Sequence, residues 1–156
     1  MAANKKPRKA YRPKPVRIDP LGYVLTGLKP VGEVGDELVM LRIKNHGALA
    51  ALTQGKASNE EFNMLISALN VTEALMLQDM GARWMPYLKA GQEALKAVGA
   101  RYKQIKRFVL RGEEMAALNL AMEVHDAQLE ICTVAQIERA IMMVRRVVTS
   151  GKATAI

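Results

Sequence analysis

Apolar side chains recur at helical spacing along most of residues 36–150, and this periodicity restricts the fold more than any other feature of the chain. Phe62, Leu65, Ile66 and Leu69 repeat at intervals of three and four residues, which places them on one face of a helix. The alternation with a period of two that marks a half-buried strand is not convincing anywhere in the sequence. The sequence therefore predicts an all-α fold, a helical bundle of about four to five helices with short connections.

Start signals divide this region into separate helices. Ser58 with Glu61, and Thr133 with Gln136, form capping boxes, in which each side chain binds the other residue's free backbone N–H. A glycine followed by two glutamates at 112–114 marks another helix start, because acidic side chains are favourable in a first turn. We expect helices over about 36–54, 58–78, from about 86, from 112, and 134–150. The last of them has the narrowest apolar stripe, made of Val134, Ile137, Ile141, Val144 and Val148.

Positive charge is concentrated at the beginning of the chain. The sequence has 23 Lys and Arg against 15 Asp and Glu, a net charge of +8. Residues 1–17 hold no acid and seven of the cations, namely Lys5, Lys6, Arg8, Lys9, Arg12, Lys14 and Arg17. Four prolines in the first 20 residues disfavour both helix and strand there. We therefore expect an extended basic arm at 1–20, a connector or short first helix at 21–35, the bundle at 36–150 and a loose tail at 151–156.

Composition excludes several classes of protein. The chain is 50% apolar and 24% charged, and this composition excludes a protein that is disordered as a whole. Apolar runs stay well below the about 18 residues that span a bilayer, so we expect no membrane partner. The single cysteine, Cys132, excludes a disulfide framework and a cysteine-based zinc site, and it favours a reducing, cytoplasmic location.

Three short motifs resemble those of a known group of proteins. The arm contains Tyr11-Arg12-Pro13-Lys14-Pro15-Val16. The body adds His46-Gly47-Ala48-Leu49-Ala50-Ala51-Leu52 with Gly55, and Leu69-Asn70-Val71-Thr72-Glu73-Ala74-Leu75. These segments are similar to small, mostly uncharacterised helical proteins of proteobacterial phages and prophages. The resemblance implies a phage protein in the host bacterial cytoplasm or the virion, with an accessory and non-enzymatic role.

The usual sequence signals for catalysis are missing. The chain has no phosphate-binding glycine loop, no GxSxG and no HExxH. His125 and Cys132 are seven residues apart on one helix, about 10 Å along its axis, which is beyond the reach of a Cys–His pair. His125 falls in an apolar stripe, so we expect a core histidine held by a polar partner. The sequence predicts no enzyme, no catalytic residue, no metal and no cofactor.

Two polar residues fall on helix faces that are otherwise apolar. Glu73 shares a face with Ile66, and Asn45 lies on the apolar face of the preceding helix between Arg42 and His46. A buried carboxylate without a partner costs several kcal/mol, so Glu73 must be paired, protonated or at an interface. One interpretation is a polar core layer in which Asn45 or Arg42 binds Glu73 and sets the register of the two helices. The other is a polar pocket that holds a small ligand or a partner side chain.

Two basic elements carry the binding prediction. One is the arm, where Tyr11 stands among the cations and suits stacking on a base. The other is a stripe on one helix face at intervals of about 10 Å or less, made of Lys89, Lys96, Lys103 and Arg107. Both suit contact with phosphates, so we expect nucleic-acid binding with little sequence preference. The alternative is a protein–protein interaction module, an inhibitor of a host nucleic-acid machine or a virion assembly component, whose arm docks in an acidic groove. Both predictions are compatible with a homo-oligomer.

Overall fold

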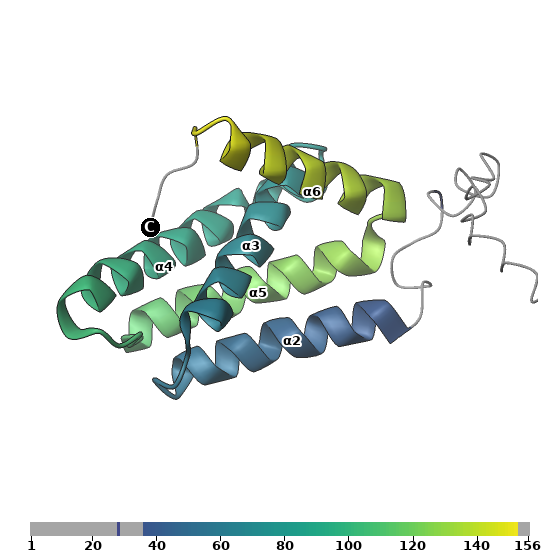
Figure 1. The fold of residues 1–156 in the computed structure, drawn as a ribbon. Coiled ribbons are helices and arrows are strands. Elements are labelled where there is room, and N and C mark those ends of the chain that lie inside the picture. Colours follow the sequence, from purple (N-terminus) through teal and green to yellow (C-terminus); the bar gives the residue numbers. More distant parts are fainter. Residues whose placement is uncertain (1–27, 29–35, 153–156) are drawn as a thin grey trace, which may run out of the picture.

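The computed structural model describes residues 28 and 36–152, and this part of the chain is an all-α bundle, as predicted (Figure 1). The predicted arm and nearly all of the connector lie outside the described residues. The described elements are α2 Asp36–Thr53, α3 Asn59–Met76, the 3-10 turn η2 Ala82–Trp84, α4 Met85–Ile105, α5 Gly112–Ile131 and α6 Val134–Thr149. Among these helices, none is long and apolar enough to cross a membrane.

Both predicted capping boxes are present. The backbone N–H of Glu60 donates to Ser58 Oγ at 3.2 Å, and the Ser58 N–H donates to the Glu61 carboxylate at 2.5 Å. At α6 the N–H of Gln136 donates to Thr133 Oγ1 at 3.3 Å, and the Thr133 N–H donates to the Gln136 side chain at 2.8 Å. The starts of α3 and α6 are therefore fixed by local hydrogen bonds that the sequence encodes directly.

Helices α4 and α5 form the most extensive helix pair, antiparallel to each other, and α3 packs against α2, α4, α5 and α6 (Figure 1). The close approach of α4 to α5 depends on Gly91, which is buried. A Cβ atom at this position would lie 2.5 Å from the Cβ of Ala121 on α5, far inside van der Waals contact. Glycine and alanine at this crossing therefore let the two backbones pack together directly.

An ion pair and a hydrogen bond link the two ends of the α4–α5 connection. The Arg101 guanidinium donates to both carboxylate oxygens of Glu114, at 3.1 and 2.5 Å, and also to the Val109 carbonyl. Partial burial alone would raise the pKa of Glu114, but the hydrogen bonds from the Arg101 side chain and the Arg111 backbone, together with the positive charge of both arginines, lower the pKa below its ordinary value. Phe108 in this connection stacks between Phe62 and Tyr102, with ring centroids 4.4 and 4.2 Å away.

The last helix, α6, is the least buried. Ala140 is its only fully buried side chain, and it joins a small cluster with residues of α3 and α5. The predicted stripe is therefore only partly used: Val134, Ile137 and Val144 are half-buried, whereas Ile141 and Val148 are exposed. The reason is that α6 packs mainly on α3, so the C-terminal half of its apolar face extends beyond that helix.

The glycine contact gives a stability test with a matched control. Gly91→Ala should lower the free energy of unfolding by about 1–3 kcal/mol, because α4 and α5 must separate to admit the methyl group. Gly47→Ala in α2 should raise it by about 0.5–1 kcal/mol, because a Cβ there meets nothing within 4 Å and alanine favours the helix. Urea denaturation measures both. A Gly91→Ala protein as stable as the wild type would contradict the close approach.

Candidate functional site

A chain of hydrogen bonds crosses the middle of the bundle. Asn45 of α2 donates from Nδ2 to His125 Nε2 of α5 at 3.3 Å, and His125 Nδ1 lies 2.8 Å from the Thr72 hydroxyl of α3. The Thr72 hydroxyl donates its proton to the Ala68 carbonyl at 3.0 Å, so the hydroxyl oxygen accepts the hydrogen bond from His125 Nδ1. These roles assign the proton of the neutral imidazole to Nδ1. His125 is thus a core histidine with polar partners, as predicted.

The predicted layer joining Glu73 to Asn45 or Arg42 is wrong. Arg42 binds Glu130 at 2.7 Å and lies 3.6 Å from Asp126, and His46 contacts Asp126 at 2.6 Å. These pairs form the outer edge of the α2–α5 interface. Thr72 takes the position facing α2 and α5, and Glu73 is turned about 100° further round α3, toward α4. A helical wheel cannot say which of two neighbouring helices a residue meets.

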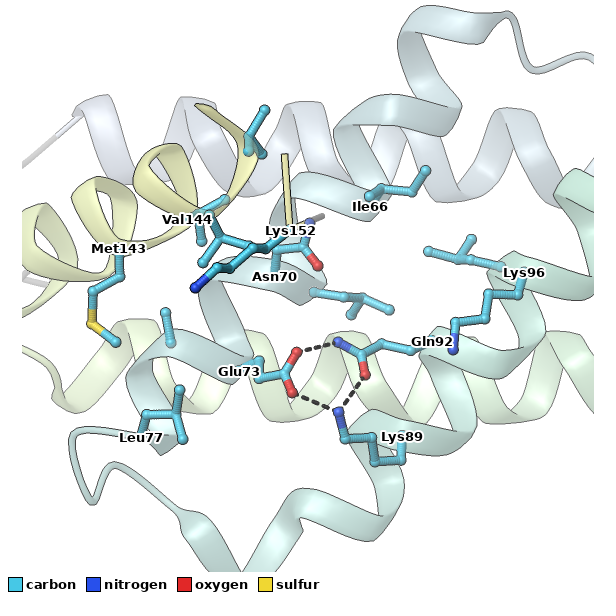
Figure 2. A pocket seen from close by; sticks show the side chains of 15 residues that line it. Ile66, Asn70, Glu73, Leu77, Lys89, Gln92, Lys96, Met143, Val144 and Lys152 are labelled. Atoms are coloured by element: carbon cyan, nitrogen blue, oxygen red, sulfur yellow. Dashed lines mark hydrogen bonds and ion pairs between the residues drawn. The ribbon is translucent and has the colours of Figure 1, made fainter. Parts of the chain in front are cut away.

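Glu73 lies instead on the α4 side of α3, where it binds two residues of α4 (Figure 2). Lys89 Nζ donates to one carboxylate oxygen at 2.5 Å, and Gln92 Nε2 donates to the other at 2.8 Å. Lys89 also donates to Gln92 Oε1 at 3.1 Å, which closes a three-residue network. Partial burial would raise the pKa of Glu73, but the bonds from Lys89 and Gln92 outweigh it and lower the pKa, so the group is a carboxylate.

This network forms one wall of a groove between α3, α4 and α6, with a volume of about 370 Å³. Figure 2 shows Lys152 extending across the opening, with Asn70 beside it and Lys96 at the α4 side. The walls are mainly aliphatic and come from all three helices: Ile66, Leu69, Ala74, Leu77, Leu95, Met143, Val144, Val147 and Val148. Glu73 therefore lines a pocket, but the walls of that pocket are mainly aliphatic rather than polar, and the ligand of the alternative interpretation stays a prediction.

The predicted stripe of four cations along α4 is divided into two parts. Lys89 is bound to Glu73, and Lys96 is bound to Glu93 at 2.6 Å. Lys103 and Arg107 are exposed, and neither forms an ion pair with any residue that the structure describes. The groove and the free cations thus occupy opposite ends of α4. The predicted arm residues Lys5, Lys6, Arg8, Lys9, Tyr11, Arg12, Lys14 and Arg17 lie outside the described residues.

Four exposed cations lie at one end of the bundle. Lys103, Lys106 and Arg107 are exposed where α4 ends, and Lys106 has a left-handed backbone with a φ of 55°. Arg107 reaches the α2–α3 turn, since its Nη2 would lie 3.4 Å from a Cβ placed on Gly55. Lys56 follows in that turn and is also exposed. We call Lys56, Lys103, Lys106 and Arg107 the cationic end.

His125 and Cys132, which could be reactive in other surroundings, are both buried and unsuited to acid–base or nucleophilic chemistry. Burial lowers the pKa of His125 to about 4, so its ring is neutral at neutral pH. Cys132 is buried, and burial raises the pKa of its thiol, which disfavours the nucleophilic thiolate. Within the described residues, no three His, Cys, Asp or Glu side chains are grouped so as to hold a metal ion.

Sequence reasoning missed several residues of the groove. Gln92 and Asn70 are not predictable from the sequence, since an amide on a helix carries no signal of its own. The contribution of α6 was missed because it depends on where that helix crosses α3. Thr72 was available as a signal, being a hydroxyl between apolar residues at the buried positions Leu69 and Leu75.

No protein-family model, no curated protein and no solved structure matches this chain. The chemistry of the site residues therefore carries the functional assignment.

The neutral core histidine gives a pH test. Between about pH 6.5 and pH 4 the unfolded chain binds a proton at His125 that the folded chain does not, so stability is lost as the pH falls through this window. The free energy of unfolding should drop by about 2 kcal/mol between about pH 7 and pH 5 from this residue. Urea titrations of the wild type and of His125→Gln check this. Parallel stability profiles for the two proteins would contradict it.

Proposed function

We propose that this protein is a non-enzymatic binding protein that engages nucleic acid through its basic arm and the cationic end, with little sequence preference. The observation that carries the proposal is the distribution of charge. Seven cations and no acid occupy residues 1–17, while the remaining residues hold 16 cations and 15 acids. A segment of this kind contributes little to a folded core, and phosphates are the ligands that such a charge density attracts most strongly.

The cationic end supports the same proposal. Lys56 comes from the α2–α3 connection, Lys103 from the last turn of α4, and Lys106 and Arg107 from the α4–α5 connection, and all four side chains are exposed. Two carboxylates near it are already engaged, because Glu61 accepts from the Ser58 backbone and Glu114 is bound by Arg101. Exposed lysines and an arginine suit phosphate contacts, which position a protein on nucleic acid without reading bases.

The role of a binding protein also fits the state of the reactive side chains. His125 uses both ring nitrogens in the buried hydrogen-bond chain, and Cys132 is buried with a raised pKa. Neither is positioned to meet a substrate. The phage resemblance of the motifs fits an accessory protein acting in the host cytoplasm.

A second candidate is the protein–protein interaction module, in which the arm docks in an acidic groove of a host machine or a virion component. The observation that favours it is an apolar surface at the start of α2. Val39, Met40 and Ile43 are 54, 51 and 59% exposed, and they lie next in the chain after the connector. Apolar side chains gathered on one surface mark interaction sites more often than isolated ones do.

The nucleic-acid proposal is tested by removing charge from each element. Deleting residues 1–17 should abolish most of the affinity for single- and double-stranded oligonucleotides. The salt slope should flatten by roughly 0.7–0.9 for each phosphate contact that the deletion removes. The combined variant Lys103→Gln, Lys106→Gln and Arg107→Gln should weaken binding further. Fluorescence anisotropy over a series of salt concentrations measures these effects.

The matched control removes the same charge elsewhere. Lys44→Gln, Arg83→Gln and Arg139→Gln together take three cations from exposed positions away from the cationic end, and should change affinity much less. If the full-length protein does not bind either oligonucleotide at low salt, the proposal is wrong and the protein-partner candidate takes its place. Equal losses from the two triple variants would show that net charge alone, and not the cationic end, attracts nucleic acid.

A further inference from the structure

The groove between α3, α4 and α6 has apolar walls that are separated by an open space. On α6, Val144, Val147 and Val148 face it, and the last two are 48 and 58% exposed although they belong to the apolar side of that helix. Across the opening lie Ile66 of α3 and Leu95 of α4. Aliphatic surfaces on three helices thus line a space that no side chain of the described residues fills, which is a favourable place for an apolar ligand.

The charges around the groove favour an anion. Lys89, Lys96 and Lys152 line it, and Glu73 is its only lining carboxylate among the described residues. Glu73 is already neutralised by Lys89, which leaves Lys96 and Lys152 in excess. The ion pair of Lys96 with Glu93 is an exposed pair within one helix, worth little, so Lys96 can turn to a ligand.

The groove also holds a free amide. Asn70 points into it from α3 (Figure 2), and its side chain forms no hydrogen bond with the described residues. Its NH₂ group is a second kind of donor beside the two lysines. An acceptor-rich headgroup would therefore find both charge and a directed hydrogen bond at the rim.

The dimensions of the groove suit a small molecule. The lining residues of α3, from Ile66 to Leu77, span about 16 Å at 1.5 Å per residue. The volume of about 370 Å³ lies within the range of small-molecule pockets, at its lower end.

We propose that this groove binds a small anionic amphiphile, an unbranched alkyl chain that carries a carboxylate headgroup. The alkyl chain lies between the valines of α6 and the aliphatic side chains of α3 and α4. The carboxylate binds at the rim, where Lys96 and Lys152 supply the positive charge and the Asn70 amide is a hydrogen-bond donor. This inference concerns a different surface from the cationic end and does not depend on nucleic-acid binding.

Isothermal titration calorimetry with decanoate, kept below the concentration at which it forms micelles, tests the proposal. We expect saturable binding of one decanoate per chain. Decyltrimethylammonium, which has the same alkyl chain and the opposite charge, should bind at least tenfold more weakly, and so should hexanoate, which buries four fewer CH₂ groups.

Two pairs of variants locate the site. Val147→Trp should fill the groove and weaken decanoate binding at least tenfold, while Met142→Trp, an exposed position of α6 that does not line the groove, should leave it unchanged. Lys96→Gln should weaken decanoate binding severalfold, and Lys103→Gln, the same change further along α4, should not. Circular dichroism confirms that each variant is folded.

Three results would overturn the proposal. The first is no saturable heat with decanoate. The second is equal affinity for decanoate and decyltrimethylammonium, which would show adsorption of the alkyl chain without recognition of the anion. The third is an equal drop in affinity for Val147→Trp and Met142→Trp, which would place the ligand elsewhere. Because Lys96 and Val147 are both exposed, neither substitution removes a core contact that the fold needs.

Discussion

The hydrogen-bond chain from the Asn45 amide through the His125 ring to the Thr72 hydroxyl and the Ala68 carbonyl joins α2, α5 and α3 at one level of the core. Every member has its partner, so the buried polar groups avoid the cost of desolvation without hydrogen bonding. A shift of any of the three helices by one residue would leave an imidazole or an amide unpaired in an apolar core. The layer thus selects one register among those that apolar packing alone would allow.

The position of the groove follows from this register. With α2, α3 and α5 fixed, the contact at Gly91 fixes α4 against α5, and Glu73 then meets Lys89 and Gln92. Helix α6 begins directly after α5 and packs on α3, but Val147 and Val148 near its C-terminal end stay exposed at the groove. Because α3 covers only part of the apolar face of α6, the groove stays open beside it, and Lys96 and Lys152 line the rim of this groove.

The sequence predicted the local features of the structure well. The capping boxes of Ser58 and Thr133 act over three residues, so the sequence alone specifies them, and the helices and the all-α class follow. The partner of Glu73 was not predictable, because Thr72 and Glu73 are consecutive and each meets a different neighbouring helix. A pocket at Glu73 was one of two interpretations of that residue, and its aliphatic walls were not predicted, since the third wall depends on where α6 crosses α3. The arm prediction rests on charge and proline content and lies outside the described residues.

Helix α4 contributes to both proposed sites, and its length keeps them apart. Lys96 at the groove and Lys103, the residue of the cationic end that lies within α4, are seven residues apart, which is about 10 Å along the helix axis. The Debye length at physiological ionic strength is about 8 Å, so a charge bound at one site is largely screened at the other. The carboxylates reinforce this separation, because Glu73 and Glu93 hold Lys89 and Lys96 while the four cations of the cationic end have no ion-pair partner among the described residues. A ligand in the groove would therefore leave phosphate contacts at the cationic end nearly unchanged at physiological salt, and any coupling between the two sites would require movement of α4 itself.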